Sequence, residues 1–406
     1  IFNVDEIERY DAPCICGKER GSELLAGKGL AFLRSGCGKH ERGALLRYGA
    51  TLNHGHRDEL GINIYAVGRE LSFDPGHYSA HYRLGWTKQT VAHITTVVNQ
   101  KSQLSPESSG GSLNYFSYSD GLSIVDVSDE GAYSSEDVKL YRRTLALIDI
   151  SYENSYFVDI FRVHGGKVRD YSFHAVDGTF QVQGLELSEP EEGSLASSEY
   201  SWGDMMRKDY RIHGYESKGY YWTPPGDGYG FLSQARRGTG SSKWNAIWCV
   251  KDEPIAKLRL TMLPNESREI IVANGPETMN NVKYVLARDT GTGPSQYISV
   301  IEPVGKEDFH VKDIETMEVV TKTVEEVKPI AFAIKLPQFG FRDYFLSTIN
   351  GECFSAIYEN DKFFTDAEFT MIRKGIHGIE RIDMEKGTCL FIDSFGFIET
   401  QREYTG

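Results

Sequence analysis

The feature that most constrains the fold of this chain is the regular spacing of short runs that are apolar or alternate between apolar and polar residues. From Gly29 onward, glycine, asparagine, aspartate or serine interrupts these runs roughly every 8–12 residues, a spacing typical of sandwich or barrel strands. β-branched and aromatic residues dominate the runs. No stretch longer than about twelve residues carries the 3.6-residue apolar stripe of an amphipathic helix. The sequence therefore predicts an all-β fold, a large multi-sheet antiparallel β-sandwich rather than alternating βαβ units.

The expected strands fall into two groups, which a change of composition near residues 325–329 separates. The first group consists of residues 43–51, 60–67, 90–98, 112–118, 121–127, 140–151, 156–163, 168–175, 228–233, 244–250, 256–262, 269–273, 284–287 and 297–302. The second group consists of residues 330–336, 344–347, 355–359, 368–373, 378–384 and 388–392. We therefore expect a linker or the remnant of an upstream domain at residues 1–28, the β-sandwich at 29–325, and a small C-terminal β domain at 326–406.

Charge and hydropathy argue against two kinds of partner. Lys and Arg number 44 against 58 Asp and Glu, a net charge of −14, whereas a sequence-wide nucleic-acid footprint needs a basic surplus. No run approaches the ~18 consecutive apolar residues of a membrane span, and no basic segment followed by an apolar one predicts a signal peptide. We therefore expect that the chain binds no nucleic acid and has no membrane-spanning segment. Binding of an anionic ligand in a locally basic groove stays open, and so does the formation of an oligomer.

Five of the eleven histidines lie within the forty residues from His54 to His93. His54 and His56 are two residues apart, a spacing that places both imidazoles on one face at the end of a strand. Asp74 follows a short run, and His93 lies on the apolar run 90–98. Three neighbouring strands could thus aim His56, Asp74 and His93 at one point. Two imidazoles and a carboxylate suit one divalent metal, with zinc as the expected ion.

Other interpretations of these residues stay open. The histidines could be separate core or surface residues, because an HxH pair alone is a weak signal. A cupin-like metal enzyme also uses HxH, but it needs a glutamate three to four residues later, and Glu59 comes too early. A non-catalytic carbohydrate-binding or scaffold module with a structural metal is a further alternative.

Several segments resemble one known family. The specific matches are residues 30–36 (LAFLRSG), 48–49 (YG), 53–58 (NHGHRD), 71–76 (LSFDPG) and 90–98 (TVAHITTVV). Looser matches follow at residues 156–165, 169–174 and 297–303. Together they resemble the β-sandwich part of the heparinase II/III-like polysaccharide lyases, over most of the stretch from residue 29 to residue 303.

The resemblance implies a role for each residue at a matching position. The first histidine of the HxH motif, His54, resembles the catalytic histidine of the family. His56, Asp74 and His93 resemble its metal ligands, usually of zinc. Tyr82 resembles a tyrosine that faces the substrate groove and assists catalysis.

The substrate side of the predicted site is less specific. Arg57 and His81 could contact anionic sugar groups, and Trp86 could stack on a sugar ring, although packing or solvated roles fit these residues equally well. One departure from the family pattern is Ile94, because the family more often has asparagine directly after the last metal ligand.

The resemblance also implies a function and a missing partner. It implies a secreted or periplasmic lyase that cleaves uronic-acid-containing polysaccharides, of the glycosaminoglycan or alginate type, by β-elimination. Family members place an (α/α) toroid before the sandwich, with the active site between the two. Residues 1–28 are too short for that toroid, so we expect a fragment, a processed half or a toroid-less relative that acts with an upstream domain.

Overall fold

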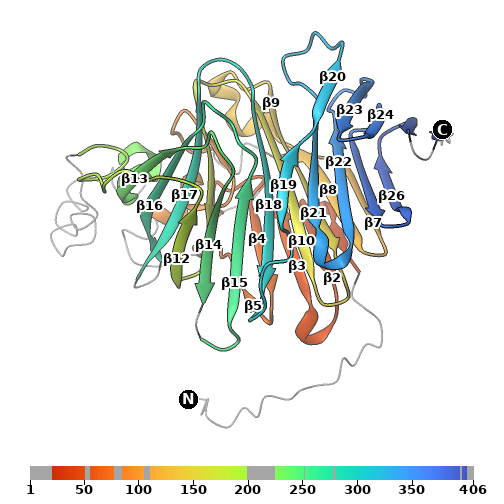
Figure 1. Ribbon diagram of the computed structural model, residues 1–406. Coiled ribbons are helices and arrows are strands. Elements are labelled where there is room, and N and C mark those ends of the chain that lie inside the picture. Colours follow the sequence, from red (N-terminus) through yellow and green to blue (C-terminus); the bar gives the residue numbers. More distant parts are fainter. Residues whose placement is uncertain are drawn as a thin grey trace.

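The predicted all-β fold is confirmed by the computed structural model, in which antiparallel sheets lie against one another (Figure 1). The structure describes residues 21–50, 55–76, 85–104, 110–198, 225–250, 252–277, 280–393 and 396–399. No helix among these residues is long and apolar enough to cross a membrane.

Three sheets form the larger part of the described chain. In spatial order, the N-terminal sheet contains β1 (Glu23–Leu25), β2 (Leu30–Ser35), β3 (Arg42–Arg47), β4 (Ile62–Ala66) and β5 (Arg69–Glu70). The central sheet contains β12 (Thr179–Gln183), β14 (Trp244–Val250), β15 (Ala256–Met262), β18 (Ser295–Val304), β10 (Ser155–His164), β9 (Leu140–Asp149), β8 (Leu122–Ser128) and β7 (Ser112–Ser119). The mid-chain sheet contains β13 (Ser233–Thr239), β16 (Glu269–Glu277), β17 (Asn280–Thr290), β11 (Val168–His174) and β6 (Thr96–Val98).

Two further sheets come from the last part of the chain. The inner C-terminal sheet contains β19 (Asp313–Thr316), β21 (Ile330–Leu336), β22 (Phe341–Ser347), β25 (Phe369–Gly375) and β26 (Gly378–Glu385). The outer C-terminal sheet contains β20 (Glu318–Thr321), β23 (Phe354–Tyr358), β24 (Asp361–Thr365), β27 (Cys389–Ile392) and β28 (Gly396–Glu399). Strands β19 and β20, which precede residue 325, thus pair with strands that follow it.

The middle of the central sheet is covered on both faces, so β8, β9 and β10 are buried along almost their whole length. On one face, Phe161 of β10 belongs to a core that includes Leu46 of the N-terminal sheet and Phe173 of the mid-chain sheet. On the other face, the next residue back, Ile160, belongs to a core with Phe345 of the inner C-terminal sheet. Because successive side chains on a strand point to opposite faces, one strand serves both cores.

Short 3-10 helices replace strands at two places where the sequence predicts strands. Residues 90–98 form η4 (Thr90–Ala92) followed by the short β6, and residues 228–233 fall mainly in η6 (Pro225–Phe231), before β13. Gly226 and Gly228 have φ angles of 60° and 101°, and this left-handed backbone is incompatible with a strand. The remaining 3-10 segments are η2 (Ala26–Lys28), η3 (Gly38–His40), η5 (Glu130–Glu136) and η7 (Pro337–Phe339).

Candidate metal centre

The three predicted metal ligands meet beside the start of β4. His56 lies in the loop that leads from β3 to β4. After β5 the chain turns back along β4, where the N–H of Leu71 donates to the carbonyl of Ile64 over 2.8 Å, and this return brings Asp74 to the same place. His93 follows η4, and the next carbonyl, that of Ile94, accepts a hydrogen bond from β4. The three residues therefore come together as predicted, but they lie in loops rather than on three neighbouring strands.

The ligand atoms are close to one another. Nδ1 of His56 lies 3.1 Å from Oδ1 and 3.3 Å from Oδ2 of Asp74. Nδ1 of His93 lies 3.8 Å from Oδ2 of Asp74, and the three ligand atoms lie within 4.8 Å of one another. Both histidines are buried, whereas the Asp74 side chain is 39% exposed. The cluster is thus anchored in the protein and reached from one side.

A backbone contact sets the tautomer of His93. Its Nε2 lies 2.9 Å from the carbonyl oxygen of Thr87, which can only accept, so Nε2 carries the proton. The lone pair is therefore on Nδ1, the atom that faces Asp74. Burial also lowers the pKa of His93, although the Asp74 carboxylate opposes this shift. A neutral imidazole with its lone pair aimed at a carboxylate is the form that binds a metal ion.

Asp74 is held in its charged form. Burial raises its pKa, but the contact with the His56 ring and the electrostatic effect of the His93 and His56 rings outweigh burial and keep this pKa well below its ordinary value. The N–H of Gly76 also donates to Oδ1 over 2.7 Å. An ionised carboxylate is the second requirement of a metal ligand.

These separations fit a divalent ion. Two atoms that each lie ~2.0–2.1 Å from a tetrahedral zinc ion are about 3.3–3.4 Å apart. From one oxygen of Asp74, Oδ2, the His56 nitrogen lies at 3.3 Å, which equals this value, and the His93 nitrogen lies at 3.8 Å, which is somewhat longer. The buried group of His56, Asp74 and His93 could therefore hold a metal ion.

A buried ion pair from the central sheet holds two of the ligand loops. Arg143 of β9 donates from Nη1 to the carbonyls of Leu60 and Ile94, over 2.6 Å and 2.7 Å. The rest of its guanidinium makes a two-armed ion pair with Asp159, at 2.8 Å and 2.6 Å. The hydroxyl of Tyr171 donates to the same carboxylate over 2.7 Å. The Arg143 side chain thus connects the loops of His56 and His93 to the centre of the fold.

A second buried network holds the loop after His56. The Glu59 carbonyl accepts hydrogen bonds from Thr95 and Gln103 over 3.0 Å and 2.9 Å, and its N–H donates to Gln103 over 2.8 Å. The Glu59 side chain is fully buried. Burial and then the nearby Asp58 charge raise the pKa of this carboxyl to about 7, against the opposing effect of Arg47.

The predicted substrate-binding residues have different surroundings. Arg57 is half-buried, and its backbone N–H donates to the carbonyl of Lys88 over 3.3 Å. Burial and then the nearby Arg57 charge lower the pKa of Lys88. Trp86 is only 2% exposed and packs against Phe231 and Tyr284, while its indole N–H bonds a backbone carbonyl. Packing accounts for Trp86, and no ring face is open to a sugar.

Three other predicted residues, His54, Tyr82 and His81, lie outside the described residues. Sequence reasoning missed Arg143, the Thr87 carbonyl and Lys88. Only Arg143 gives a signal, because two adjacent arginines in the apolar run 140–151 need buried partners. The other two depend on the path of loops, which a sequence pattern does not give.

Comparison with known sequences finds one distant relative. No protein-family model matches the chain. An exo-oligoalginate lyase from Saccharophagus degradans is 22% identical over 309 residues, an alignment that covers 69% of this chain and 37% of the lyase.

Comparison with solved structures confirms the fold that the resemblance implies. A heparinase III gene product superposes with a TM-score of 0.52 at 15% identity, over 79% of this chain and 41% of the heparinase. A heparan sulfate lyase from Pedobacter heparinus gives a TM-score of 0.42 at 12% identity, over 84% of this chain and 42% of the lyase. The chain thus has the fold of part of heparinase III and spans less than half the length of each of these proteins.

Proposed function

We propose that this chain is the β-sandwich part of a polysaccharide lyase that cleaves uronic-acid-containing polymers by β-elimination. The observation that carries the proposal is the buried cluster of His56, Asp74 and His93, in a fold shared with heparinase III. The distant alginate lyase relative supports the same class of reaction. Glycosaminoglycans and alginate are the proposed substrates, and a secreted or periplasmic location is the one such polymers require.

The proposed ion is zinc, and its proposed task is to fix a loop. Two imidazoles and one carboxylate are a ligand set that suits zinc. His54 is only two residues before His56, so an ion bound by His56 would restrict the backbone that carries the proposed catalytic histidine. When bound, the ion supplies positive charge and a rigid anchor. In this proposal it takes no direct part in the reaction.

The chemistry needs groups that neutralise a carboxylate and transfer protons. The C5 proton of a uronate is too weakly acidic to leave unless the adjacent carboxylate is neutralised. A histidine of near-neutral pKa and a tyrosine suit this work, and each proton transfer by a placed group contributes about 10²–10⁴-fold. We assign carboxylate binding or proton transfer to His54, with Tyr82 as its helper and an upstream toroid as the other wall of the groove.

Two basic side chains would attract the anionic polymer. Arg57 and Lys88 are near enough for the charge of Arg57 to lower the pKa of Lys88, and Arg57 is one residue from His56. Two positive charges close together attract a polyanion. Arg57 is therefore the substrate-binding residue that the described structure supports best.

The alternative is a carbohydrate-binding or scaffold module with a structural metal. Such a module would use the buried group of His56, Asp74 and His93 only to stabilise its fold. A cupin-like enzyme fits less well, since the metal ligands here come from loops beside a sheet and not from strands that line a barrel.

The experiment is a lyase assay on alginate and on heparan sulfate, followed by the ultraviolet absorbance of the unsaturated product. The chain is assayed alone and together with any domain encoded before Ile1. Absorbance that rises with the intact chain and not with a His54→Ala variant supports the proposal. If the polymer binds but no unsaturated product forms, either with the chain alone or with the upstream domain present, the chain is a carbohydrate-binding module instead.

A further inference from the structure

A polar groove lies at the other end of β3 from the metal centre. Its volume is about 670 Å³, within the usual range of small-ligand sites. The turns β2–β3, β7–β8 and β9–β10 line it, together with residues of the inner C-terminal sheet. The β2–β3 turn is at the lower edge of Figure 1. Three sheets therefore contribute to one concave surface.

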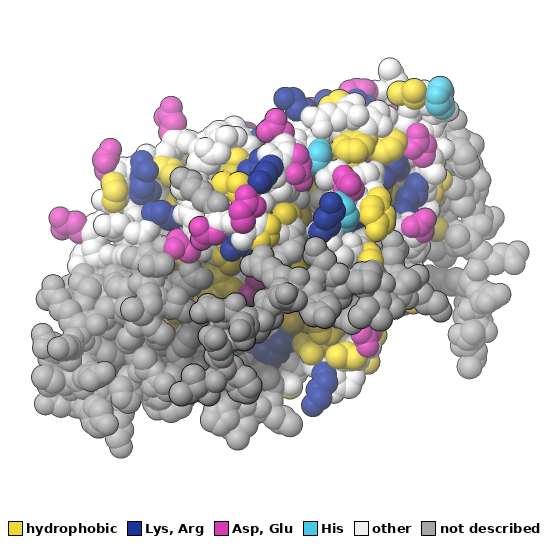
Figure 2. Space-filling model, turned by 90° about the horizontal axis from the view of Figure 1, so that it is seen from below, with side chains coloured by type: hydrophobic (Ala, Val, Ile, Leu, Met, Phe, Trp, Pro, Cys, Tyr) yellow, Lys and Arg dark blue, Asp and Glu magenta, His cyan; other side chains and the backbone are white. Residues whose placement is uncertain are grey.

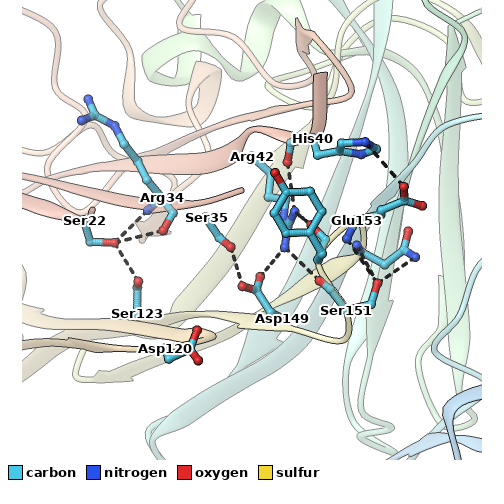
Figure 3. A network of polar contacts seen from close by, with 12 residues as sticks. Ser22, Arg34, Ser35, His40, Arg42, Asp120, Ser123, Asp149, Ser151 and Glu153 are labelled. Atoms are coloured by element: carbon cyan, nitrogen blue, oxygen red, sulfur yellow. Dashed lines mark hydrogen bonds and ion pairs between the residues drawn. The ribbon is translucent and has the colours of Figure 1, made fainter. Parts of the chain in front are cut away.

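The floor of the groove is a fixed network around Asp149 (Figure 3). This carboxylate accepts hydrogen bonds from the hydroxyl of Ser35 and, over 2.6 Å, from Arg42. Arg42 also donates to the carbonyls of Tyr152 and Ser151, over 2.6 Å and 3.2 Å. Arg42 is buried, and its Nε has no hydrogen-bond partner among the described residues. The groove is thus a built polar surface with an unused buried donor.

Two arginines of the inner C-terminal sheet close the groove. Arg373 donates to the carbonyl of Asp149 over 2.9 Å. Arg381 donates to the hydroxyl of Ser119 over 2.8 Å and to the carbonyl of Asp120. These contacts hold the β7–β8 and β9–β10 turns in place, so the groove does not need a ligand to form.

The rim carries two exposed aromatic side chains. Tyr118, near the end of β7, is 61% exposed, and Tyr152, in the β9–β10 turn, is 59% exposed; both line the groove. Tyrosine offers a rigid apolar ring with a polar end, which loses little side-chain entropy on binding. Exposed rings above a floor of hydrogen-bonding groups suit a ligand with apolar faces and polar edges.

The arginines in the groove are paired with carboxylates. Arg42 pairs with Asp149 at 2.6 Å, Arg373 pairs with Asp343 at 2.7 Å, and Arg381 pairs with Asp383. Figure 2, the view from below, shows basic and acidic side chains interspersed over the described part of that face. Alternating donors and acceptors match the hydroxyl groups of a sugar, each of which both donates and accepts.

We propose that this groove binds a pyranose oligosaccharide, with sugar rings stacked on Tyr118 and Tyr152. Hydroxyl groups of the sugar hydrogen-bond to the exposed Asp120 and to the polar edge around Asp149. The site holds a polymer on the sandwich without cleaving it. It does not depend on the metal centre or on lyase activity.

The test is a calorimetric titration of the chain with a mannuronate tetrasaccharide and with cellotetraose, at low and at high salt. The double variant Tyr118→Ala/Tyr152→Ala should weaken binding about tenfold or more, since lost stacking and burial together amount to about 1.4 kcal/mol. Tyr65→Ala removes an exposed tyrosine outside the groove and should leave the affinity unchanged. Added salt should have little effect, because the arginines in the groove are paired with carboxylates.

A His56→Ala variant separates this proposal from the proposed function, since it should bind the sugar normally even where metal or lyase activity is lost. Asp120→Asn checks the hydrogen bonds and should weaken binding without changing the melting temperature. Absence of saturable binding, an affinity unchanged in the double tyrosine variant, or an affinity that falls steeply with salt would each overturn the proposal.

Discussion

Arg142 and Arg143 are neighbours on β9, yet they stabilise different parts of the molecule. Arg143 points into the core shared with the N-terminal and mid-chain sheets and bonds the two loops of the metal centre. Arg142 points to the opposite face, where it bonds Asp126 over 2.6 Å and reaches Glu368 beside the inner C-terminal sheet. Because side chains alternate along a strand, one residue step separates the two functions.

The two arginines differ in what surrounds them. The Arg143 and Asp159 side chains are fully buried, and both arms of the guanidinium are used within the protein. The Arg142 side chain is 10% exposed and its second partner, Glu368, is 21% exposed. Water can therefore replace part of a lost contact at Arg142 but not at Arg143. The comparison indicates that the metal centre depends on the dry face of the central sheet.

The largest effect is expected from Arg143→Met. It leaves the Asp159 charge buried without its partner and removes the donor from the carbonyls of Leu60 and Ile94. Removing one partner of such a pair costs about 3–5 kcal/mol of unfolding free energy. Denaturant unfolding measures the loss. Arg143→Lys keeps the positive charge but not the two-armed guanidinium, so it should recover only part of the lost unfolding free energy. Full recovery would contradict the proposed contacts.

A smaller effect is expected from Arg142→Met. Its loss leaves Asp126 and Glu368 without this donor, at a cost of about 1–3 kcal/mol. Hydrogen exchange should show faster opening in the inner C-terminal sheet and unchanged protection around His93. Loss of protection around His93 equal to that in Arg143→Met would mean that the two faces are not independent.

Much of the fold follows from the sequence, and the reason is physical. Strands β14, β15 and β21 are found at the predicted residues, because β-branched runs bounded by turn residues have one stable extended arrangement. The runs at 90–98 and 228–233 failed as uninterrupted strands. An apolar 3-10 segment such as η4 packs into a core as well as a strand does, and periodicity over so few residues does not separate the two.

The residues of the candidate metal centre could be predicted from the sequence, but the contacts that hold them together could not. The histidine cluster with Asp74 indicates the ligands, since such residues rarely gather by chance. The carbonyl of Thr87 and the reach of Arg143 to Leu60 arise from tertiary packing of segments far apart in sequence. A pattern of residue types carries no information about which carbonyl a loop presents.

Metal removal should have an effect that distinguishes the two arginines. A bound ion stabilises only the folded chain, so a chelator should lower the melting temperature by several degrees. Differential scanning calorimetry should show this shift in the wild type and in Arg142→Met. The shift should shrink in Arg143→Met, whose ligand loops are released. If the chelator lowered the melting temperature of both arginine variants equally, Arg143 would not support the metal centre.

The smallest effect is a pH dependence at Glu59. Its folded pKa is about 7 against an ordinary value of 4.5, so the folded chain keeps a proton that the unfolded chain releases between these values. The stability from this group is fully present below pH 4.5 and is lost as the pH rises to about 7. Glu59→Gln should therefore gain stability relative to the wild type from pH 5 to pH 8. A difference between the two proteins that does not vary with pH would contradict the assignment.

The central claim is that His56, Asp74 and His93 hold one metal ion, and elemental analysis of the purified chain tests it most directly. The account predicts about one zinc per wild-type chain, and almost none in a folded His56→Ala variant. His164→Ala, which changes a histidine paired with Glu326 outside the cluster, is the matched control and should keep the ion. Equal zinc in the wild type and in His56→Ala, or none in the wild type after growth with zinc, would contradict the account.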